Sequence, residues 1–411
     1  MEALERDDMS TGIGEIFARF HRERARLEQT VDELKAALRR YSGVVLYGAG
    51  SSGIALLLAL RRADIQPLCF ADGAPEKWGT QCMGLEVVPP QTLTERFGAN
   101  ILVLVCINTD GQAYCRSFDE ALRAGGHSGV HQRLREWGCT NVVDYVALRR
   151  CFALFRGDNT GNLPSCPDVD SLVEHQERIE RVFERLADGL SKEIYANILT
   201  FRLFGEGPEI PTLSQEEKYF PKELFTPAAE EHFVDCGAFD GQTLRDLLAL
   251  TGGRVGAYYA LEPDTVNFKR LEQFAAQLPE ALRAKSTLFP CAAWSGEGKL
   301  PLYALHGPGS FAAPYGGTQA EATSIDKLLD GRRATAVKMN IEGSELAALK
   351  GAEKTLRRWR PKLMIAGYHK TWDFWAVPEV MLEAGYEVYL RSYMHHLSFV
   401  FYGLGSPYTF S

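Results

Sequence analysis

The sequence lacks a long hydrophobic run, a cysteine pair with metal-binding spacing and any surplus of positive charge. Its most apolar stretches, Ile54–Leu60 and Ile101–Ile107, are too short to span a bilayer and indicate buried core segments. Nine cysteines occur without a Cys-x-x-Cys pair, which favours reduced, buried thiols over a metal centre. A net charge of −8 argues against binding to the phosphate backbone of nucleic acids. Because the acidic N-terminus has no apolar segment typical of a secretory signal, we expect a cytoplasmic protein without a membrane span.

A chain of 411 residues is longer than a single hydrophobic core usually supports, so we expect two domains. The residue patterns divide the chain into an amphipathic helix in 1–40, a Rossmann-like α/β domain in 41–155, a helical connector in 156–230 and a second α/β domain in 231–411. Alternating strands and helices predict a doubly wound parallel sheet in each α/β domain. The apolar stripe of the first helix suits packing on its own domain or pairing with a second copy of the chain. Both a monomer and a homo-oligomer are therefore compatible with the sequence.

The second α/β domain contains seven strand-like segments. They are Phe233–Cys236, Ala257–Leu261, Thr287–Ala292, Ala336–Asn340, Lys362–Ala366, Glu387–Leu390 and Ser398–Tyr402. The last two are separated by a short loop and predict an antiparallel hairpin at one edge of the sheet. A purely parallel nucleotide-binding sheet does not need such a hairpin.

The first glycine-rich turn, VVLYGAGSSG, follows a predicted strand and precedes a predicted helix. Gly48, Gly50 and Gly53 have the G-x-G-x-x-G spacing, with Ser51 between them, and Asp72 follows the next strand. This context fits a nucleotide or nucleotide-sugar site, in which the helix N-terminus binds phosphate and Asp72 binds a ribose. A tight strand-to-helix turn favours the same glycines, and Asp72 also suits a turn, so both interpretations stand.

The second glycine-rich turn, VDCGAFDGQT, is followed by a strand that ends at Glu262, twenty-five residues after Gly237. A carboxylate at that place can accept hydrogen bonds from both ribose hydroxyls of an adenosine. Asp235 and Asp240 would repel a pyrophosphate and attract a sulfonium or ammonium group. The turn therefore favours S-adenosylmethionine over a dinucleotide, with Asp235 facing the ammonium.

Five ordered motifs between about residues 232 and 370 resemble the FkbM family of S-adenosylmethionine-dependent methyltransferases. The motifs are VDCGAFDGQT, ALEPDTVNFKRL, TSIDKLL, VKMNIEGSELAALKGA and RPKLMIAGYH. The resemblance implies a seven-stranded class I methyltransferase fold. The cofactor-binding residues that we expect are Asp235, Gly237, Ala238, Phe239, Gly241, Thr243, Glu262, Pro263, Ala293, Trp294 and Asn340. For Trp294, ordinary core packing is the alternative to a contact with adenine.

The N-terminal domain, with LYGAGSSG and DGAPEKWGTQCMGLEVV, is similar to nucleotide-sugar-handling modules of polysaccharide biosynthesis enzymes. The helical segment LADGLSKEIYANILTFRL resembles the connector of family members that carry such a domain. This similarity implies a small-molecule or saccharide acceptor, and a nucleotide or nucleotide sugar as an additional ligand of the N-terminal domain.

Three residues near the ends of predicted strands are candidates for catalysis. His369 has the pKa range of a general base for an acceptor hydroxyl, although it also suits a capping role. Glu342 is expected to face the methyl donor or the acceptor. Asn340 departs from the family pattern K-x-D-x-E-G, since an amide keeps an acceptor oxygen but lacks the negative charge. We expect Asn340 to preserve binding better than turnover, and buried Lys338 to need a partner.

The sequence thus favours an O-methyltransferase that acts on a saccharide or a related hydroxylated metabolite. A nucleotide-dependent oxidoreductase centred on the first glycine turn is the alternative, weakened because no Tyr-x-x-x-Lys motif follows. A third hypothesis is a sensor whose methyltransferase-like domain binds a ligand without catalysis, with Asn340 marking the lost chemistry.

Overall fold

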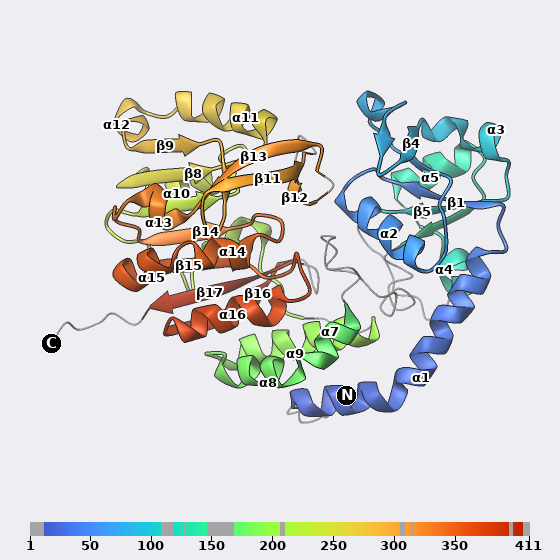
Figure 1. Ribbon diagram of the computed structural model, residues 1–411, viewed down its shortest axis with the longest axis horizontal. Helices are drawn as coiled ribbons and strands as arrows, with labels where there is room; N and C mark the ends of the chain where they lie inside the picture. The colour runs from blue at the N-terminus through green and yellow to red at the C-terminus, as the bar shows by residue number, and fades with distance from the viewer. Residues whose placement is uncertain are drawn as a thin grey trace, which may run out of the picture. The chain divides into compact units, whose positions relative to one another are not determined.

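The computed structural model describes residues 12–107, 118–126, 128–145, 168–205, 210–304, 309–314, 316–393 and 398–405. The chain forms two compact units, coloured by residue number in Figure 1. The first unit comprises Met1–Phe183 and Tyr195–Pro208, and the second comprises Glu184–Ile194 and Glu209–Ser411. Within the described residues, no helix combines the length and hydropathy that a membrane crossing requires.

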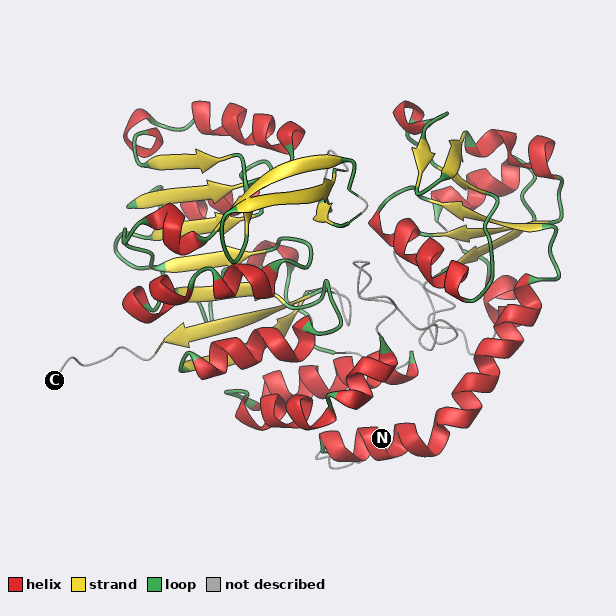
Figure 2. Cartoon of the chain, in the orientation of Figure 1, coloured by secondary structure: helices red, strands yellow, loops and turns green. Residues whose placement is uncertain are grey.

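The first unit contains a six-stranded sheet of β1 (Gly43–Tyr47), β2 (Cys69–Ala71), β3 (Gln81–Cys82), β4 (Leu85–Val88), β5 (Ile101–Val105) and β6 (Asn141–Asp144). The strand order is β3-β4-β2-β1-β5-β6, and only the β3–β4 pair is antiparallel. The short helices of this unit are α2 (Ser51–Arg62), η1 (Pro75–Lys77), η2 (Pro90–Thr92), α3 (Leu93–Phe97), α4 (Phe118–Ala124) and α5 (Gly129–Glu136) (Figure 2). The predicted doubly wound sheet is confirmed here, with β3 and β4 as an additional hairpin.

The N-terminal helix α1 (Ile13–Leu38) is a single long helix, as its apolar spacing predicts. Its apolar positions Ile16, Phe20, Leu27, Val31, Leu34 and Leu38 are all buried within the one chain. Phe20 packs edge-on against Phe204, near the end of α9 (Gly189–Phe204), with ring centroids 5.9 Å apart. The two helices before α9 are α7 (Val169–Glu174) and α8 (Gln176–Arg185). The apolar stripe of α1 therefore packs on its own chain.

The second unit is built on a seven-stranded sheet of β7 (His232–Cys236), β8 (Ala257–Leu261), β9 (Ser286–Phe289), β14 (Ala336–Met339), β15 (Lys362–Ala366), β16 (Tyr386–Ser392) and β17 (Phe399–Gly405). The strand order is β16-β17-β15-β14-β7-β8-β9. Strand β17 pairs antiparallel with both β15 and β16, and the other neighbours are parallel. The antiparallel edge hairpin is confirmed, and each of the seven predicted strands overlaps one strand of this sheet.

The helices of the second unit connect these strands, as Figure 1 shows. They are η3 (Gln215–Glu217), α10 (Gln242–Thr251), α11 (Thr265–Ala276), α12 (Glu280–Arg283), α13 (Ile325–Leu329), α14 (Glu345–Lys350), α15 (Glu353–Trp359) and α16 (Asp373–Glu383). The core between sheet and helices is strongly apolar, and Phe233, Leu244 and Leu271 in it are completely buried. Since the parallel strands are covered by these helices, most of their residues are apolar and buried.

A small four-stranded sheet, which the sequence patterns did not predict, lies between β9 and α13 along the chain. It consists of β10 (Ala292–Ala293), β11 (Gly298–Tyr303), β12 (Phe311–Ala312) and β13 (Thr318–Thr323), in the order β10-β13-β11-β12. Strands β11 and β13 pair antiparallel, with Leu300 opposite Ala320. The predicted strand Thr287–Ala292 is thus divided between β9 of the large sheet and β10 of this small sheet.

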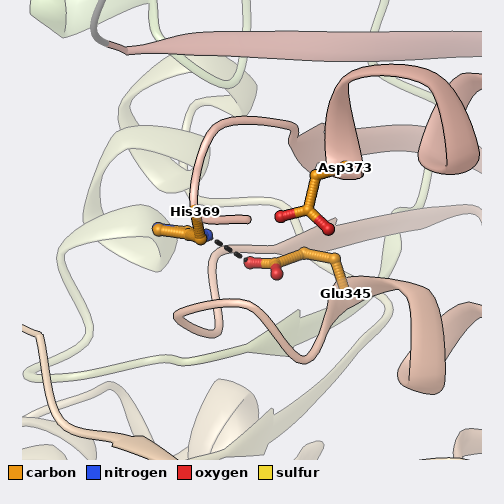
Figure 3. A group of neighbouring side chains, drawn as sticks. All are labelled: Glu345, His369 and Asp373. Atoms are coloured by element: carbon orange, nitrogen blue, oxygen red, sulfur yellow. Dashed lines mark hydrogen bonds and ion pairs between the residues drawn. The ribbon is translucent and has the colours of Figure 1, made fainter. Parts of the chain in front are cut away.

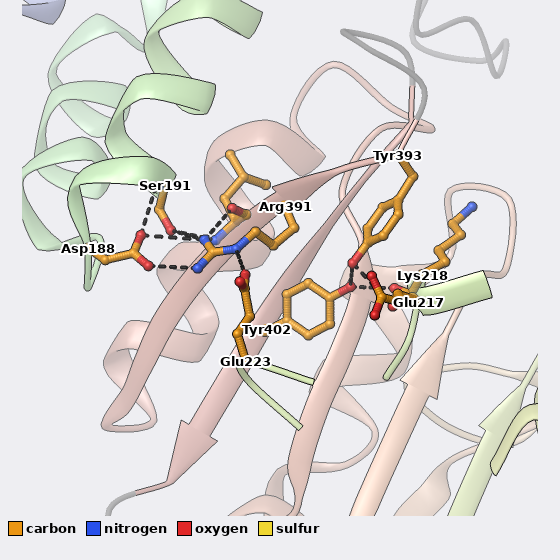
Figure 4. Close-up of polar contacts among 9 residues, drawn as sticks. Asp188, Ser191, Glu217, Lys218, Glu223, Arg391, Tyr393 and Tyr402 are labelled. Carbon is orange, nitrogen blue, oxygen red and sulfur yellow. Dashed lines mark hydrogen bonds and ion pairs between the residues drawn. The ribbon is translucent and has the colours of Figure 1, made fainter. Parts of the chain in front are cut away.

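A buried arginine joins the edge strand β16 to the start of α9 (Figure 4). The guanidinium of Arg391 donates to the carboxylate of Asp188 at 2.7 Å, to the Ser191 hydroxyl at 3.1 Å and to the Glu223 carboxylate. The side chain of Arg391 is 5% exposed. Because guanidinium and carboxylate match in shape, this contact ties three separate segments of the second unit together.

Substituting Arg391→Met is therefore expected to lower the free energy of unfolding by about 2 kcal/mol. The loss stays below that of a fully buried pair, because Asp188 and Glu223 are 32% and 48% exposed and can rehydrate. Arg357→Met is the matched control, since Arg357 is 78% exposed in its pair with Glu353 and should change stability by about 0.5 kcal/mol or less. Urea unfolding measures both variants, and equal losses would contradict the assigned role of Arg391.

Candidate active site

The turn that follows β7 needs glycine for steric reasons. Gly237 has a φ of +77°, and a Cβ atom there would lie 2.2 Å from the carbonyl oxygen of Asn340. Gly241 has a φ of +86°, and a Cβ atom there would lie 2.1 Å from the ring of Phe274. Both glycines adopt the left-handed conformation that side chains disfavour. They let the ends of β7 and β14 approach each other and start α10.

A cavity opens at the carboxyl ends of β7, β8 and β14, where open α/β sheets bind ligands. Six of the predicted cofactor residues line it, namely Gly237, Phe239, Glu262, Pro263, Ala293 and Asn340. The opposite wall comes from the small sheet through Leu300, Leu302, Ala312 and Ala320. Glu342 also lines the cavity. The small sheet thus supplies apolar wall residues that sequence patterns did not identify.

Glu262 is the acidic residue at the end of β8, and only 5% of it is exposed. Its carboxylate accepts hydrogen bonds from the backbone N–H of Phe239 and of Asp264, each at 3.0 Å. Burial raises the pKa of this carboxyl group, while the two N–H donors oppose that shift. A carboxylate has about four lone-pair sites, so Glu262 keeps acceptor capacity toward the cavity.

Several predicted cofactor residues lie outside the cavity wall. Ala238, Gly241 and Thr243 shape the turn and the first turn of α10. Trp294 follows β10 of the small sheet. Its backbone N–H donates to the Thr323 carbonyl at 2.8 Å, and its backbone carbonyl lies close to Gly351. Trp294 does not line the cavity, and its expected contact with adenine stays a prediction.

Asp235 is completely buried and forms an ion pair inside the sheet. Its carboxylate lies 2.9 Å from Lys338 Nζ and accepts from the Tyr258 hydroxyl at 3.1 Å. Asp235 and Lys338 are opposite each other in the parallel pairing of β7 and β14. The ammonium that Asp235 contacts is thus that of Lys338, in place of the ligand ammonium that we expected. Lys338 in turn has the partner that its burial requires.

Glu342 has a left-handed backbone with a φ of +55°, and Phe239 has a φ of +51°. Such conformations cost non-glycine residues about 1–3 kcal/mol and persist only where the surroundings fix them. Glu345 fixes the turn around Glu342, since its carboxylate accepts from the N–H groups of Ile341 at 2.8 Å and Gly343 at 2.9 Å. The sequence after β14 therefore holds the carboxylate of Glu342 at the cavity.

His369 lies between two carboxylates rather than at the cavity wall. Its Nδ1 is 2.8 Å from Glu345 (Figure 3), and its Nε2 is 3.5 Å from Glu342. Burial lowers the pKa of His369, but the two carboxylates outweigh it and raise this pKa well above the usual value. The two carboxylates therefore favour the protonated form of the ring. The general-base role that we expected for His369 stays a prediction.

Asp373 faces Glu345 on the side away from His369, as Figure 3 shows. The three side chains have the ligand types of a divalent metal site, with donor atoms within 4.8 Å of one another. Both oxygens of Glu345 and Nδ1 of His369 are already engaged in the hydrogen bonds described above. We therefore assign no metal to this group.

Burial and the Glu345 carboxylate raise the pKa of Asp373 to about 7. Because this pKa lies above the ordinary value of about 3.9, the stability that the protonated form contributes is present below pH ~4 and lost as the pH rises through ~7. Asp373→Asn should remove this loss, so the variant gains stability relative to the wild type between pH 5 and pH 8. Urea unfolding at both pH values checks this, with Glu272→Gln as an exposed control. A stability difference between Asp373→Asn and the wild type that is the same at pH 5 and at pH 8 would contradict the raised pKa of Asp373.

The comparisons with known proteins agree with this geometry. The family model described as "Methyltransferase FkbM domain" matches residues 235–400. This segment is an FkbM methyltransferase domain. The resemblance predicted from the motifs is thereby confirmed, and the domain is of the S-adenosylmethionine-dependent class. The sequence has no significant match among curated proteins.

One solved structure supports the fold of this chain. The crystal structure of methyltransferase FkbM from Methylobacillus flagellatus KT matches with a TM-score of 0.62 and 21% identity, over 95% of this chain and 100% of that chain. Aeropyrum pernix fibrillarin, solved with natively bound S-adenosyl-L-methionine, has a TM-score of 0.31 and 10% identity over 46% of this chain and 74% of that chain. The first match shows a shared fold and confirms the predicted class I methyltransferase architecture.

The cavity of the FkbM domain has the charge that a sulfonium cofactor requires. Among the described residues that line it, the charged ones are Glu262 and Glu342, and none is a lysine or arginine. A low-dielectric cavity with this lining attracts a cation and repels a pyrophosphate. The residues present therefore fit S-adenosylmethionine, with Glu262 in the place of a ribose acceptor.

Asn340 connects the cavity to two residues that the sequence patterns did not single out. The hydroxyl of Tyr368 donates to Asn340 Oδ1 at 3.2 Å, and Lys218 Nζ donates to the same hydroxyl at 3.2 Å. Tyr368 is the second residue after β15, whereas Lys218 lies 150 residues earlier in the chain. In the sequence, the only indication that either residue belongs to the site is that Tyr368 is next to His369.

In the N-terminal unit, the first glycine-rich turn is explained largely by packing. A Cβ atom at Gly53 would lie 2.0 Å from the Gly48 carbonyl, and Gly48 has a φ of +112°. Gly50 precedes α2, which begins at Ser51. The carboxylate of Asp72 accepts from the N–H of Ala49 at 2.8 Å and of Ala74 at 2.9 Å, and pairs with Lys77 at 2.9 Å. Asp72 thus stabilises the turn, and a nucleotide or nucleotide-sugar ligand stays a prediction.

Proposed function

We propose that the FkbM domain is an O-methyltransferase that transfers a methyl group from S-adenosylmethionine to a hydroxyl of a saccharide or a related metabolite. The observation that carries this proposal is the acidic cavity at the carboxyl edge of the sheet, which contains Glu262 and Glu342 and no cationic side chain among its described residues. A hydroxyl acceptor is favoured because Glu342 offers a carboxylate for the proton that the hydroxyl loses.

The residues of this chain have separate tasks in the proposed reaction. When bound, S-adenosylmethionine supplies an electrophilic methyl group on its sulfonium. Glu262 binds and orients the nucleoside, and the apolar wall of Leu300 and Leu302 excludes water. The carboxylate of Glu342 accepts the proton of the acceptor hydroxyl, and the His369 ring, whose Nε2 lies 3.5 Å away, positions that carboxylate.

Asn340 is a neutral residue at the cavity and suits binding better than proton transfer. Its Oδ1 already accepts from the Tyr368 hydroxyl, so its amide N–H groups stay available as donors. An amide cannot take up the acceptor proton at neutral pH. This assignment places the base at Glu342 and lets the domain function with Asn340.

Transfer of labelled methyl from S-adenosylmethionine to a panel of saccharides tests the proposal. We expect label in an ether that is stable to mild alkali, and a loss of at least about a hundredfold in rate for Glu342→Gln, in the range typical of general-base removal. A methyl ester or a methylated amine would contradict O-methylation of a hydroxyl. Full activity of Glu342→Gln would contradict the assigned base. If Asn340→Asp alone were active, the sensor hypothesis would replace the enzyme.

A further inference from the structure

Lys218 is a half-buried lysine whose ammonium contacts only neutral groups. Nζ donates to the Tyr368 hydroxyl at 3.2 Å and lies 5.3 Å and 5.6 Å from the ring centroids of Tyr368 and Tyr219. No carboxylate of the described residues forms an ion pair with it. This cation therefore has unused capacity to donate to an anion.

Hydrogen bonds from neighbouring segments hold the backbone around Lys218 in place. The Tyr402 hydroxyl donates to the Lys218 carbonyl, and the hydroxyl groups of Tyr393 and Tyr402 contact each other (Figure 4). The Gln215 amide donates to the Tyr393 carbonyl at 2.7 Å. Figure 4 shows the Lys218 side chain extending away from this tyrosine pair. The edge hairpin thereby holds the segment that presents the ammonium.

Lys218 lies two hydrogen bonds from the cavity, through Tyr368 and Asn340. Tyr368 follows β15 and Asn340 follows β14, so both stand at the carboxyl edge of the sheet. The cavity itself is acidic through Glu262 and Glu342, whereas the Lys218 side is cationic. This separation of charge places a cationic ligand group at one end of the site and an anionic one at the other.

We propose that Lys218 and Tyr368 bind an anionic group, a carboxylate or a phosphate, on the methyl acceptor. The inference rests on the proposed function and narrows the acceptor from hydroxylated metabolites in general to acidic ones, such as uronic acids or sugar phosphates. The ammonium and the phenol hydroxyl each donate one hydrogen bond to the anion. The Tyr368 hydroxyl exchanges its bond to Asn340 for this one, which frees Asn340 Oδ1.

Calorimetric titration of the S-adenosylhomocysteine complex with three probes tests the proposal. The probes are D-glucuronate, D-glucose 1-phosphate and neutral D-glucose. We expect at least one of the two anions to bind at least about tenfold more tightly than glucose, the difference expected for one charge-assisted hydrogen bond. The probe that binds more tightly distinguishes a carboxylate from a phosphate.

Three variants assign any anion binding to this site. Lys218→Met should weaken the preferred anion about tenfold, Lys218→Arg should retain it, and Tyr368→Phe should weaken it a few-fold. Lys222→Met is the matched control, because Lys222 is 83% exposed in the same segment and should bind the anion like the wild type. Affinity for S-adenosylhomocysteine should be unchanged in Lys218→Met.

Equal binding of glucose and both anions, or undiminished anion binding by Lys218→Met, would overturn the proposal. So would the absence of binding by all three probes to a complex that contains S-adenosylhomocysteine. A folded wild-type protein that fails to bind S-adenosylhomocysteine would instead contradict the proposed function. The cofactor titration therefore separates the two failures.

Discussion

Glu262→Gln is expected to weaken the binding of S-adenosylhomocysteine about a hundredfold, while the protein stays folded. The substitution keeps the size of the side chain but removes the charge that strengthens its hydrogen bonds. Losing charge assistance on bonds to ribose hydroxyls costs about 3 kcal/mol, which corresponds to that factor. The amide oxygen can still accept from the N–H groups of Phe239 and Asp264, so the turn should persist. Isothermal titration calorimetry measures the affinity.

Asp240→Asn is the matched control for this prediction. Asp240 belongs to the same turn, but its carboxylate pairs with Arg245 at 3.4 Å and does not line the cavity. We expect its affinity for S-adenosylhomocysteine to stay within about twofold of the wild type, as for surface changes away from the ligand. Equal losses in Glu262→Gln and Asp240→Asn would show that acidity of the turn in general, rather than Glu262, determines binding.

Lys338→Met should lower the free energy of unfolding by about 3–5 kcal/mol, because it leaves a buried carboxylate without its cation. Asp235 is completely buried and Lys338 is 2% exposed. Lys338 also donates to the carbonyl oxygen of Gly237 at 2.7 Å, at the start of the glycine turn. Its loss should therefore also weaken S-adenosylhomocysteine binding. Urea unfolding, monitored by circular dichroism, gives the stability.

Two further variants separate the charge effect from simple loss of packing. The double variant Asp235→Asn with Lys338→Met removes both charges and should be less destabilised than the sum of the two single variants. Lys299→Met breaks an exposed pair with Glu321, in which the lysine is 67% exposed, and should cost about 1 kcal/mol or less. Additive single effects would contradict a buried ion pair as the reason for the loss.

The large elements of the fold follow from local patterns in the sequence. Most residues of the seven main strands are apolar or aromatic, and Ala257–Leu261 and Lys362–Ala366 end where they were predicted. The small sheet escaped prediction because its strands are short or largely polar. Thr318–Thr323 reads TQAEAT and has only two buried residues, and Gly298–Tyr303 contains a proline. Pairing between strands, rather than local preference, stabilises such segments.

The site was predictable where a motif fixes the backbone, and less so where distant side chains meet. Gly237 and Glu262 follow the neighbouring parallel strands β7 and β8, so their spacing places both at the cavity. The partner of Asp235 depends on the register between β7 and β14, across 103 residues of chain. No periodicity specifies that register in strands that are buried on both faces.

The protonation of His369 illustrates the same limit. The sequence correctly places a histidine after β15, but its charge depends on Glu342 and Glu345, which lie more than twenty residues away along the chain. The contact between the Trp294 carbonyl and Gly351 was equally hidden, because it joins two separate segments of the chain. Burial and partners, which decide such roles, are properties of the folded chain.

Calorimetric titration of the wild-type protein with S-adenosylmethionine tests the central claim most directly. The account predicts binding of one molecule per chain, with competition by S-adenosylhomocysteine and none by NAD or by a nucleoside diphosphate, because the acidic cavity repels a pyrophosphate. A folded protein that releases no heat with S-adenosylmethionine, or whose cavity prefers the pyrophosphate ligands, would contradict the claim that this domain is built around a sulfonium cofactor.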